Sequence, residues 1–140
     1  NGIKTTAGLV TMIPAAGSIP SFPTGSVSLS AGSANVANAS GVATLTGTAT
    51  TKVYISGFQV TGAGATAGAV VTVTVAGLLG GTRSFTYTFA TGAVVANQPL
   101  LIQFTPPLPA SAVNTPIVVT CPASGTGGTN NTVNAQGFYV

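Results

Sequence analysis

Residues 82–89 place the hydroxyl-bearing Thr82, Ser84, Thr86 and Thr88 on one side of an extended chain and the aromatic Phe85, Tyr87 and Phe89 on the other. Residues 70–75 repeat the pattern, with Val71, Val73 and Val75 on one face and Thr72 and Thr74 on the other. A period of two residues is that of a half-buried β-strand, because successive side chains of a strand point to opposite faces. Both segments therefore predict strands that cover a core with one face.

Further strands are expected in segments rich in Thr, Val, Tyr and Phe, which favour a pleated surface. These segments are residues 51–60, 100–105, 115–121 and 132–140, with a weaker one at 36–45. Glycine-rich gaps at 62–68, 77–81, 91–93 and 125–128 supply turns, because glycine tolerates positive φ. No window has a helical period. We predict an all-β chain, folded as an antiparallel β-sandwich or jelly roll with an extended N-terminal arm.

The arm is expected over residues 1–33, and the β-sandwich domain over residues 34–140. Prolines and glycines interrupt short apolar clusters in the first segment, and proline fixes φ and removes a backbone donor. A free linker rarely carries so many large apolar groups, so we expect the arm to lie on its own domain or on a neighbouring subunit. The candidate assembly contacts are Leu9, Met12, Ile13, Ile19 and Phe22.

A second proline-rich stretch, Pro106-Pro107-Leu108-Pro109, follows Phe104. Such a segment could serve as a ligand for an aromatic groove. Inside a β domain we instead predict a stiff corner between two strands.

Charge is almost missing from the chain, which contains no Asp, Glu or His and whose charged residues are Lys4, Lys52 and Arg83. General acid–base catalysis, catalytic triads and oxygen-ligand metal sites need carboxylates or imidazoles. The sequence therefore predicts a protein that is not an enzyme, with no catalytic residue, metal site or cofactor. The three cations lie far apart in sequence, which argues against nucleic-acid binding.

No stretch reaches the roughly 18–20 apolar residues of a membrane span, so no membrane partner is expected.

Two single residues have competing interpretations. Cys121 is the only cysteine and alternates with Ile117 and Val119, so we expect a small buried hydrophobic side chain rather than a reactive thiol. Arg83 falls on the same side of its strand as Phe85. We expect it at the edge of the core with its stem packed and its head in water, a subunit contact being the alternative.

Carbohydrate binding stays open at this point, because β-sandwiches often perform it. The chain has no tryptophan, however, and Tyr54, Tyr87 and Tyr139 are not grouped in sequence as a stacking platform.

Three segments carry a resemblance to a known class of proteins: GSVSLSAGS at 25–33, YISGFQVTGAGAT at 54–66 and FTPPLPAS at 104–111. They resemble small, uncharged, Ala/Gly/Thr-rich structural proteins of tailed bacteriophages and prophages, over most of residues 25–140. The resemblance implies a virion component on the capsid surface, similar to head decoration (cement) proteins, which sit on the capsid as repeated copies, often trimers. The implied partners are further copies of the chain and the major capsid protein.

Two other functions fit the same features. The chain could be a secreted, extracellular filament subunit whose arm adds a strand to the next subunit. It could also be a receptor-binding fibre module, which would need glycan or cell-surface affinity in the loops around residues 62–68 and 124–131.

Overall fold

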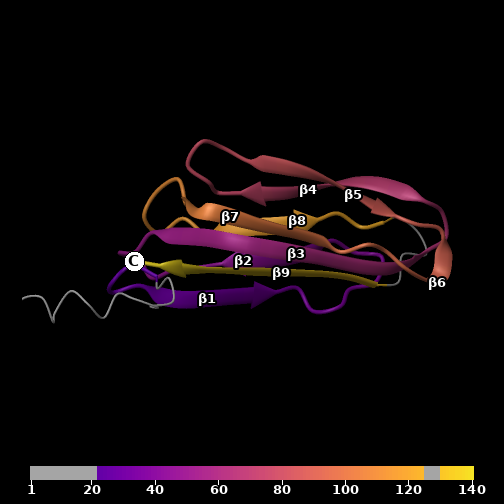
Figure 1. Cartoon of the computed structure of the whole chain (residues 1–140), viewed down its shortest axis with the longest axis horizontal. Coiled ribbons are helices and arrows are strands. Elements are labelled where there is room, and N and C mark those ends of the chain that lie inside the picture. Colours follow the sequence, from indigo (N-terminus) through magenta and orange to yellow (C-terminus); the bar gives the residue numbers. More distant parts are fainter. Residues whose placement is uncertain (1–21, 125–129) are drawn as a thin grey trace, which may run out of the picture.

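The computed structural model describes residues 22–124 and 130–140, and its strands run roughly along the long axis of the molecule (Figure 1). Within these two ranges there is no helix, which confirms the all-β prediction. The strands are β1 (Val27–Gly32), β2 (Gly41–Leu45), β3 (Val53–Ala65), β4 (Ala69–Ala76), β5 (Arg83–Phe89), β6 (Gly92–Ala96), β7 (Leu100–Pro109), β8 (Ile117–Cys121) and β9 (Asn130–Tyr139).

The strands form two antiparallel sheets that pack face to face. The first sheet has the order β1-β9-β3, and the far side of β3 pairs with β7 along one part and with β6 along another. The second sheet has the order β2-β8-β4-β5. With β6 set aside, the pairs β1–β9, β2–β8, β3–β7 and β4–β5 are nested inside one another, which is the jelly-roll arrangement. The predicted sandwich or jelly roll is therefore confirmed.

The core lies between the sheets and is filled by the alternating faces that the sequence predicts. On β5, Tyr87 and Phe89 are buried and Phe85 is half-buried, while on β4 Val73 and Val75 are fully buried. Phe58 of the first sheet meets the edge of Phe85 at 5.2 Å between ring centroids. The other fully buried large side chains are Leu45, Ile55, Ile117, Val53, Val60, Val119 and Val133.

Part of the predicted arm belongs to the sandwich. Residues 27–32 form β1, which pairs with β9 along its whole length and makes one edge of the first sheet. Residues 1–21 lie outside the described residues, as do the candidate contacts Leu9, Met12, Ile13 and Ile19.

The predicted corner at Pro106–Pro109 is wrong, because these residues are the second half of β7. Leu108 and Pro109 pair with Ile55 and Tyr54 of β3. Proline lacks a backbone donor, but β7 is an edge strand, and an edge strand needs donors on one side only.

Two predicted turns are partly strand in the structure. β6 begins at Gly92, within the expected turn at 91–93, and β3 continues to Ala65, so that only residues 66–68 of the expected loop at 62–68 connect β3 to β4. Glycine suits β3 at Gly62, because a Cβ there would come within 2.5 Å of Cε1 of the buried Phe89 ring. Pairing with Asn130 and Asn131 of β9 extends the strand through this glycine.

Candidate functional site: an amide-lined groove

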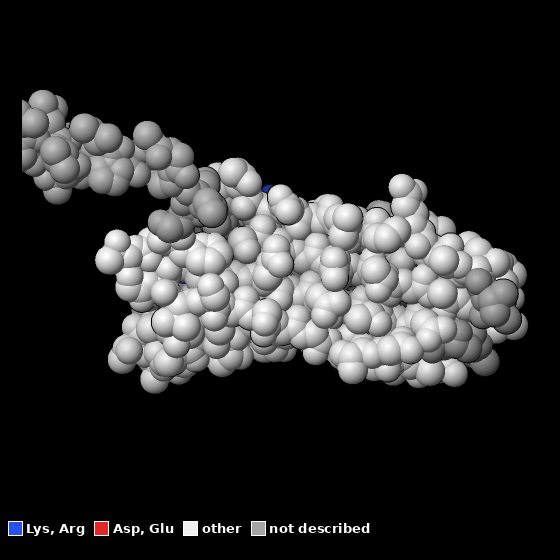
Figure 2. All heavy atoms as spheres, turned by 60° about the horizontal axis from the view of Figure 1, so that its bottom comes forward, with Lys and Arg blue, Asp and Glu red and all other residues white. Residues whose placement is uncertain are grey.

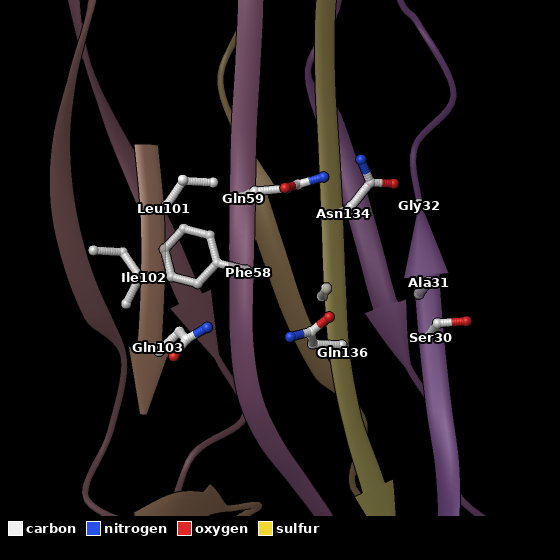
Figure 3. A pocket seen from close by; sticks show the side chains of 11 residues that line it. Ser30, Ala31, Gly32, Phe58, Gln59, Leu101, Ile102, Gln103, Asn134 and Gln136 are labelled. Carbon is white, nitrogen blue, oxygen red and sulfur yellow. The ribbon is translucent and has the colours of Figure 1, made fainter. Parts of the chain in front are cut away.

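A shallow groove of about 550 Å³ crosses the outer face of the first sheet (Figure 3). Residues of four strands line it, and four of its side chains are carboxamides: Gln59 on β3, Gln103 on β7, and Asn134 and Gln136 on β9. Ser30 of β1 and Leu101 of β7 lie at its two sides. No ionisable side chain lines the groove, so its polar surface consists of amides and a hydroxyl.

A β-bulge puts these amides on one face. The register of β3 shifts between Ile55 and Gly57 against both β9 and β7, so that Ile55 and Phe58 are both buried in the core. An uninterrupted strand would place residues 55 and 58 on opposite faces. The hydroxyl of Ser56, within the bulge, donates a hydrogen bond of 3.0 Å to the carbonyl oxygen of Gln136. Gln59 therefore faces outward together with its partner Asn134.

Strand pairing arranges the groove in two rows across the sheet. The first row is Ser30, Gln136, Gly57 and Gln103, and the second is Gly32, Asn134, Gln59 and Leu101. Neighbouring strands lie about 4.8 Å apart, and successive same-face residues of one strand lie about 7 Å apart. Each row contains one glycine, which leaves room for the larger side chains beside it.

The amide side chains lie across the sheet surface. Figure 3 shows Gln59 extending from β3 towards β9, Gln136 from β9 towards β3, and Asn134 from β9 towards β1. A Cβ on Gly32 would come within 2.5 Å of Oδ1 of Asn134, so glycine provides the space that this amide occupies. Among the described residues, no hydrogen bond engages the four groove amides. Their donors and acceptors are available to a ligand or to water.

An aromatic cluster lies on the same face, one row from Gln136. Tyr54 of β3 stacks on its register partner Phe138 of β9, with centroids 4.9 Å apart and planes 6° apart. Phe22 also packs on Phe138, with ring centroids 4.9 Å apart. Phe138 is only 3% exposed although it points away from the core, because these two rings cover it. Phe22 itself is 45% exposed.

The predicted assembly contact Phe22 thus lies on its own domain, and its role between subunits stays a prediction. The three tyrosines are separate in the structure, since Tyr87 is in the core and Tyr139 packs against the core from β9. Tyr54 nevertheless belongs to an aromatic group, whose other members are phenylalanines. Tyr54 and Phe138 meet because their strands pair. The sequence could have predicted this contact only if the register of the two strands were known.

Cys121 is fully buried beside Ile117 and Val119, as predicted. Burial raises the pKa of its thiol to about 11, and a hydrogen bond from Asn131 offsets part of that rise. The buried Asn131 also donates from Nδ2 to the carbonyl oxygens of Cys121, at 3.3 Å, and Pro122, at 3.4 Å. An inaccessible thiol with a raised pKa is a packing group, because thiol reactivity requires the exposed thiolate.

The raised pKa of Cys121 gives stability a defined pH dependence. The folded state keeps the thiol protonated up to about pH 11, whereas the unfolded thiol ionises near its ordinary value of 9.0. The unfolded state therefore binds fewer protons between these values, and the free energy of unfolding falls as pH rises through that window. We expect a loss on the order of 2 kcal/mol between about pH 9 and 11, measured by urea unfolding.

The Cys121→Ala variant is the control, and its stability should fall less over the same window. Burial also raises the pKa of Tyr87, so some loss of stability should remain in the variant. Below about pH 8 the curve should be flat down to about pH 4, because the chain has no side chain that titrates there. A steep change in stability between pH 4 and 8 would contradict this account.

The charged residues within the described part of the chain are Lys52 and Arg83. Arg83 is exposed at the first residue of β5, and Lys52 immediately precedes β3. Figure 2 shows a face on which nearly all described atoms belong to uncharged residues. Neither cation lines the groove.

A scan against family models and a search of curated sequences found no match to this chain. Within residues 22–124 and 130–140, no helix has the length and apolar character needed to cross a membrane. The same residues contain no group of three or more His, Cys, Asp or Glu side chains that could hold a metal ion.

Proposed function

We propose that the chain is a non-enzymatic structural protein of a virion, a capsid decoration protein that packs as repeated copies on a head lattice. The observation that carries this proposal is the set of sheet edges that the described domain leaves unpaired, all but one of which carry no charged residue. The proposal also rests on the resemblance of residues 25–33, 54–66 and 104–111 to phage structural proteins.

In the first sheet the edge strands are β1 on one side and β6 and β7 on the other. In the second sheet they are β2 and β5. Of these, only β5 carries a charged residue, Arg83. An edge strand presents unpaired N–H and C=O groups, and monomeric proteins usually protect it with charges, prolines or bulges. Three prolines protect the second half of β7, but residues 100–105 carry none. β1 carries neither a charge nor a proline. These segments are suited to adding a strand from a neighbour.

The uncharged surface suits permanent packing. Burying an ionised side chain in an interface costs desolvation energy, and this domain would have few to bury. Contacts made by amides, hydroxyls and apolar groups are also insensitive to salt, since screening acts on charges. A capsid-stabilising subunit needs many such contacts, which repetition on a lattice converts into durable binding.

Fold analogy gives further, weaker support. Jelly rolls recur in viral capsid domains, but a fold is shared by many functions and does not identify one.

The N-terminal arm has a role in the proposed assembly too. Its apolar residues Leu9, Met12, Ile13 and Ile19 would contact a neighbouring subunit, entering from the end of the domain where Phe22 packs on Phe138.

The open edges favour a second candidate from another class, a filament subunit assembled by donor-strand exchange. In that case the arm of one copy would pair with β1 or with residues 100–105 of the next copy. The two candidates differ in their products: decoration gives small closed oligomers that bind capsids, whereas donor-strand exchange gives open-ended fibres.

Lysine substitutions on the free edges test whether the edges carry assembly. We expect Val27→Lys on β1 or Leu101→Lys on β7 to reduce self-association at least about tenfold, because a charge opposes strand addition. The two side chains are 47% and 66% exposed, so the domain should stay folded. Sedimentation equilibrium of each variant measures the effect.

Val113→Lys is the matched control, because it also replaces an exposed apolar residue by lysine. Val113 is 52% exposed and lies in the turn before β8, outside any strand. If Val113→Lys dissociates the oligomer and the edge variants do not, the copies do not meet through these edges and the edge account is wrong.

A further inference from the structure

We propose that the groove on the outer face of the first sheet is a binding site for a neutral oligosaccharide or polysaccharide. This inference goes beyond the proposed assembly role, because it concerns a sheet face and not the edges. It rests on three features of the groove: its amides, its lack of charge and the apolar groups beside them.

The amides match a ligand covered with hydroxyl groups. A sugar hydroxyl both donates and accepts hydrogen bonds, and a carboxamide offers an acceptor oxygen and two donor hydrogens. Gln59, Gln103, Asn134 and Gln136 present four such groups from three adjacent strands. Spacings of about 4.8 Å between strands and about 7 Å along them let two amides reach one sugar residue. Because these side chains are not engaged within the described chain, binding a sugar breaks no internal hydrogen bond.

The absence of charge selects against ionic ligands. An acidic sugar or a phosphate would lose hydration in the groove and gain no ion pair, which makes its binding unfavourable. The described cations, Lys52 and Arg83, do not line the groove. A peptide lying across the groove would fit poorly, because the backbone hydrogen-bonding groups of the strands lie in the plane of the sheet and only side chains face outward. The chemistry that remains is a neutral, polyhydroxylated chain.

Apolar groups flank the amides on the same face. Leu101, in the row of Gln59 and Asn134, is 66% exposed and offers an apolar side to the groove. Tyr54 and Phe138 occupy the row next to Gln136 and Gln103, and the Tyr54 ring is half-buried. The C–H faces of sugar rings pack on aromatic and aliphatic groups, whereas their hydroxyls require polar partners. The two kinds of surface adjoin here, as in ligand sites generally.

Biolayer interferometry with the purified full chain tests the proposal, using immobilised dextran, mannan, galactan and xylan as neutral probes and alginate as the acidic comparison. We expect binding to at least one neutral polysaccharide and weaker binding to alginate. The double variant Gln59→Ala/Gln136→Ala should weaken that binding at least about tenfold, since two hydrogen-bonding side chains are lost. Its thermal unfolding should match that of the parent protein, because both side chains lie on the outer face.

Gln98→Ala is the matched control, since Gln98 is exposed and lies outside the groove. Binding should be unchanged in this variant and insensitive to salt. The proposal is overturned if none of the neutral polysaccharides binds, if alginate binds as tightly as they do, or if the double variant binds as well as the parent. Sugar binding is measured without capsids or self-association, so its failure is distinguishable from a failure of the assembly role.

Discussion

Replacement of Gly137 by alanine is expected to destabilise the domain by about 3 kcal/mol or more, a large part of the roughly 5–15 kcal/mol by which an ordinary domain is stable. A Cβ on this residue of β9 would overlap the carbonyl oxygen of Tyr54 and lie 3.1 Å from Cα of Ile55. Both atoms belong to the backbone of β3, the strand that β9 contacts through its whole length. Side chains can rotate away from an inserted methyl group, but a paired backbone must shift the sheet. Guanidinium unfolding followed by circular dichroism measures the loss.

Gly68→Ala is the control for this substitution. Gly68 has no strained φ, and a Cβ there would meet its nearest atom, Oγ1 of Thr91, at 3.4 Å, which is ordinary contact. Its stability should stay within about 0.5 kcal/mol of the parent protein. Equal stability of the Gly137→Ala and Gly68→Ala variants would mean that β3 and β9 do not approach as closely as described.

Truncation of Phe89 to alanine is the second large effect, with an expected loss of about 3–5 kcal/mol in the free energy of unfolding. Phe89 is fully buried, meets the edge of Tyr87 at 5.0 Å, and fills the space above Gly62 of the opposite sheet. Its removal leaves a cavity between the sheets that the paired strands cannot close. Urea unfolding measures the loss.

Phe22→Ala is the matched control, because the same side-chain atoms are removed from a ring that is 45% exposed. It should cost less than about 1.5 kcal/mol. A double-mutant cycle adds a sharper test: Gly62→Ala should destabilise the parent protein but cost less in the Phe89→Ala background, where the new methyl group enters the cavity. Additive effects would show that Phe89 does not pack on Gly62.

The fold could be predicted where one strand face is buried and the other is not. The alternation of valine on β4, of aromatic residues on β5 and of Ile117, Val119 and Cys121 on β8 specifies both the strand and its inner face. β1 was missed although Val27, Leu29 and Ala31 alternate with serines, because it lies in the proline- and glycine-rich stretch that was interpreted as an arm. It is a strand because β9 offers it a pairing edge, which is a tertiary cause.

The groove could not be predicted from the sequence, because it depends on register. Gln59 and Gln136 share a face only because the bulge at Ser56 and Gly57 shifts β3 by one residue against β9. The same shift explains why Tyr54 faces outward onto Phe138. Glutamines scattered over three strands carry no local signal, and the absence of charge indicated only which chemistry to exclude.

The proposed assembly role is tested most directly by the mass and shape of the purified full chain, measured by light scattering and electron microscopy, first alone and then with tailed-phage capsids. The account predicts discrete small oligomers that bind to the capsid surface. Open-ended fibres that form without capsids, or a protein that stays monomeric at every concentration, would contradict it.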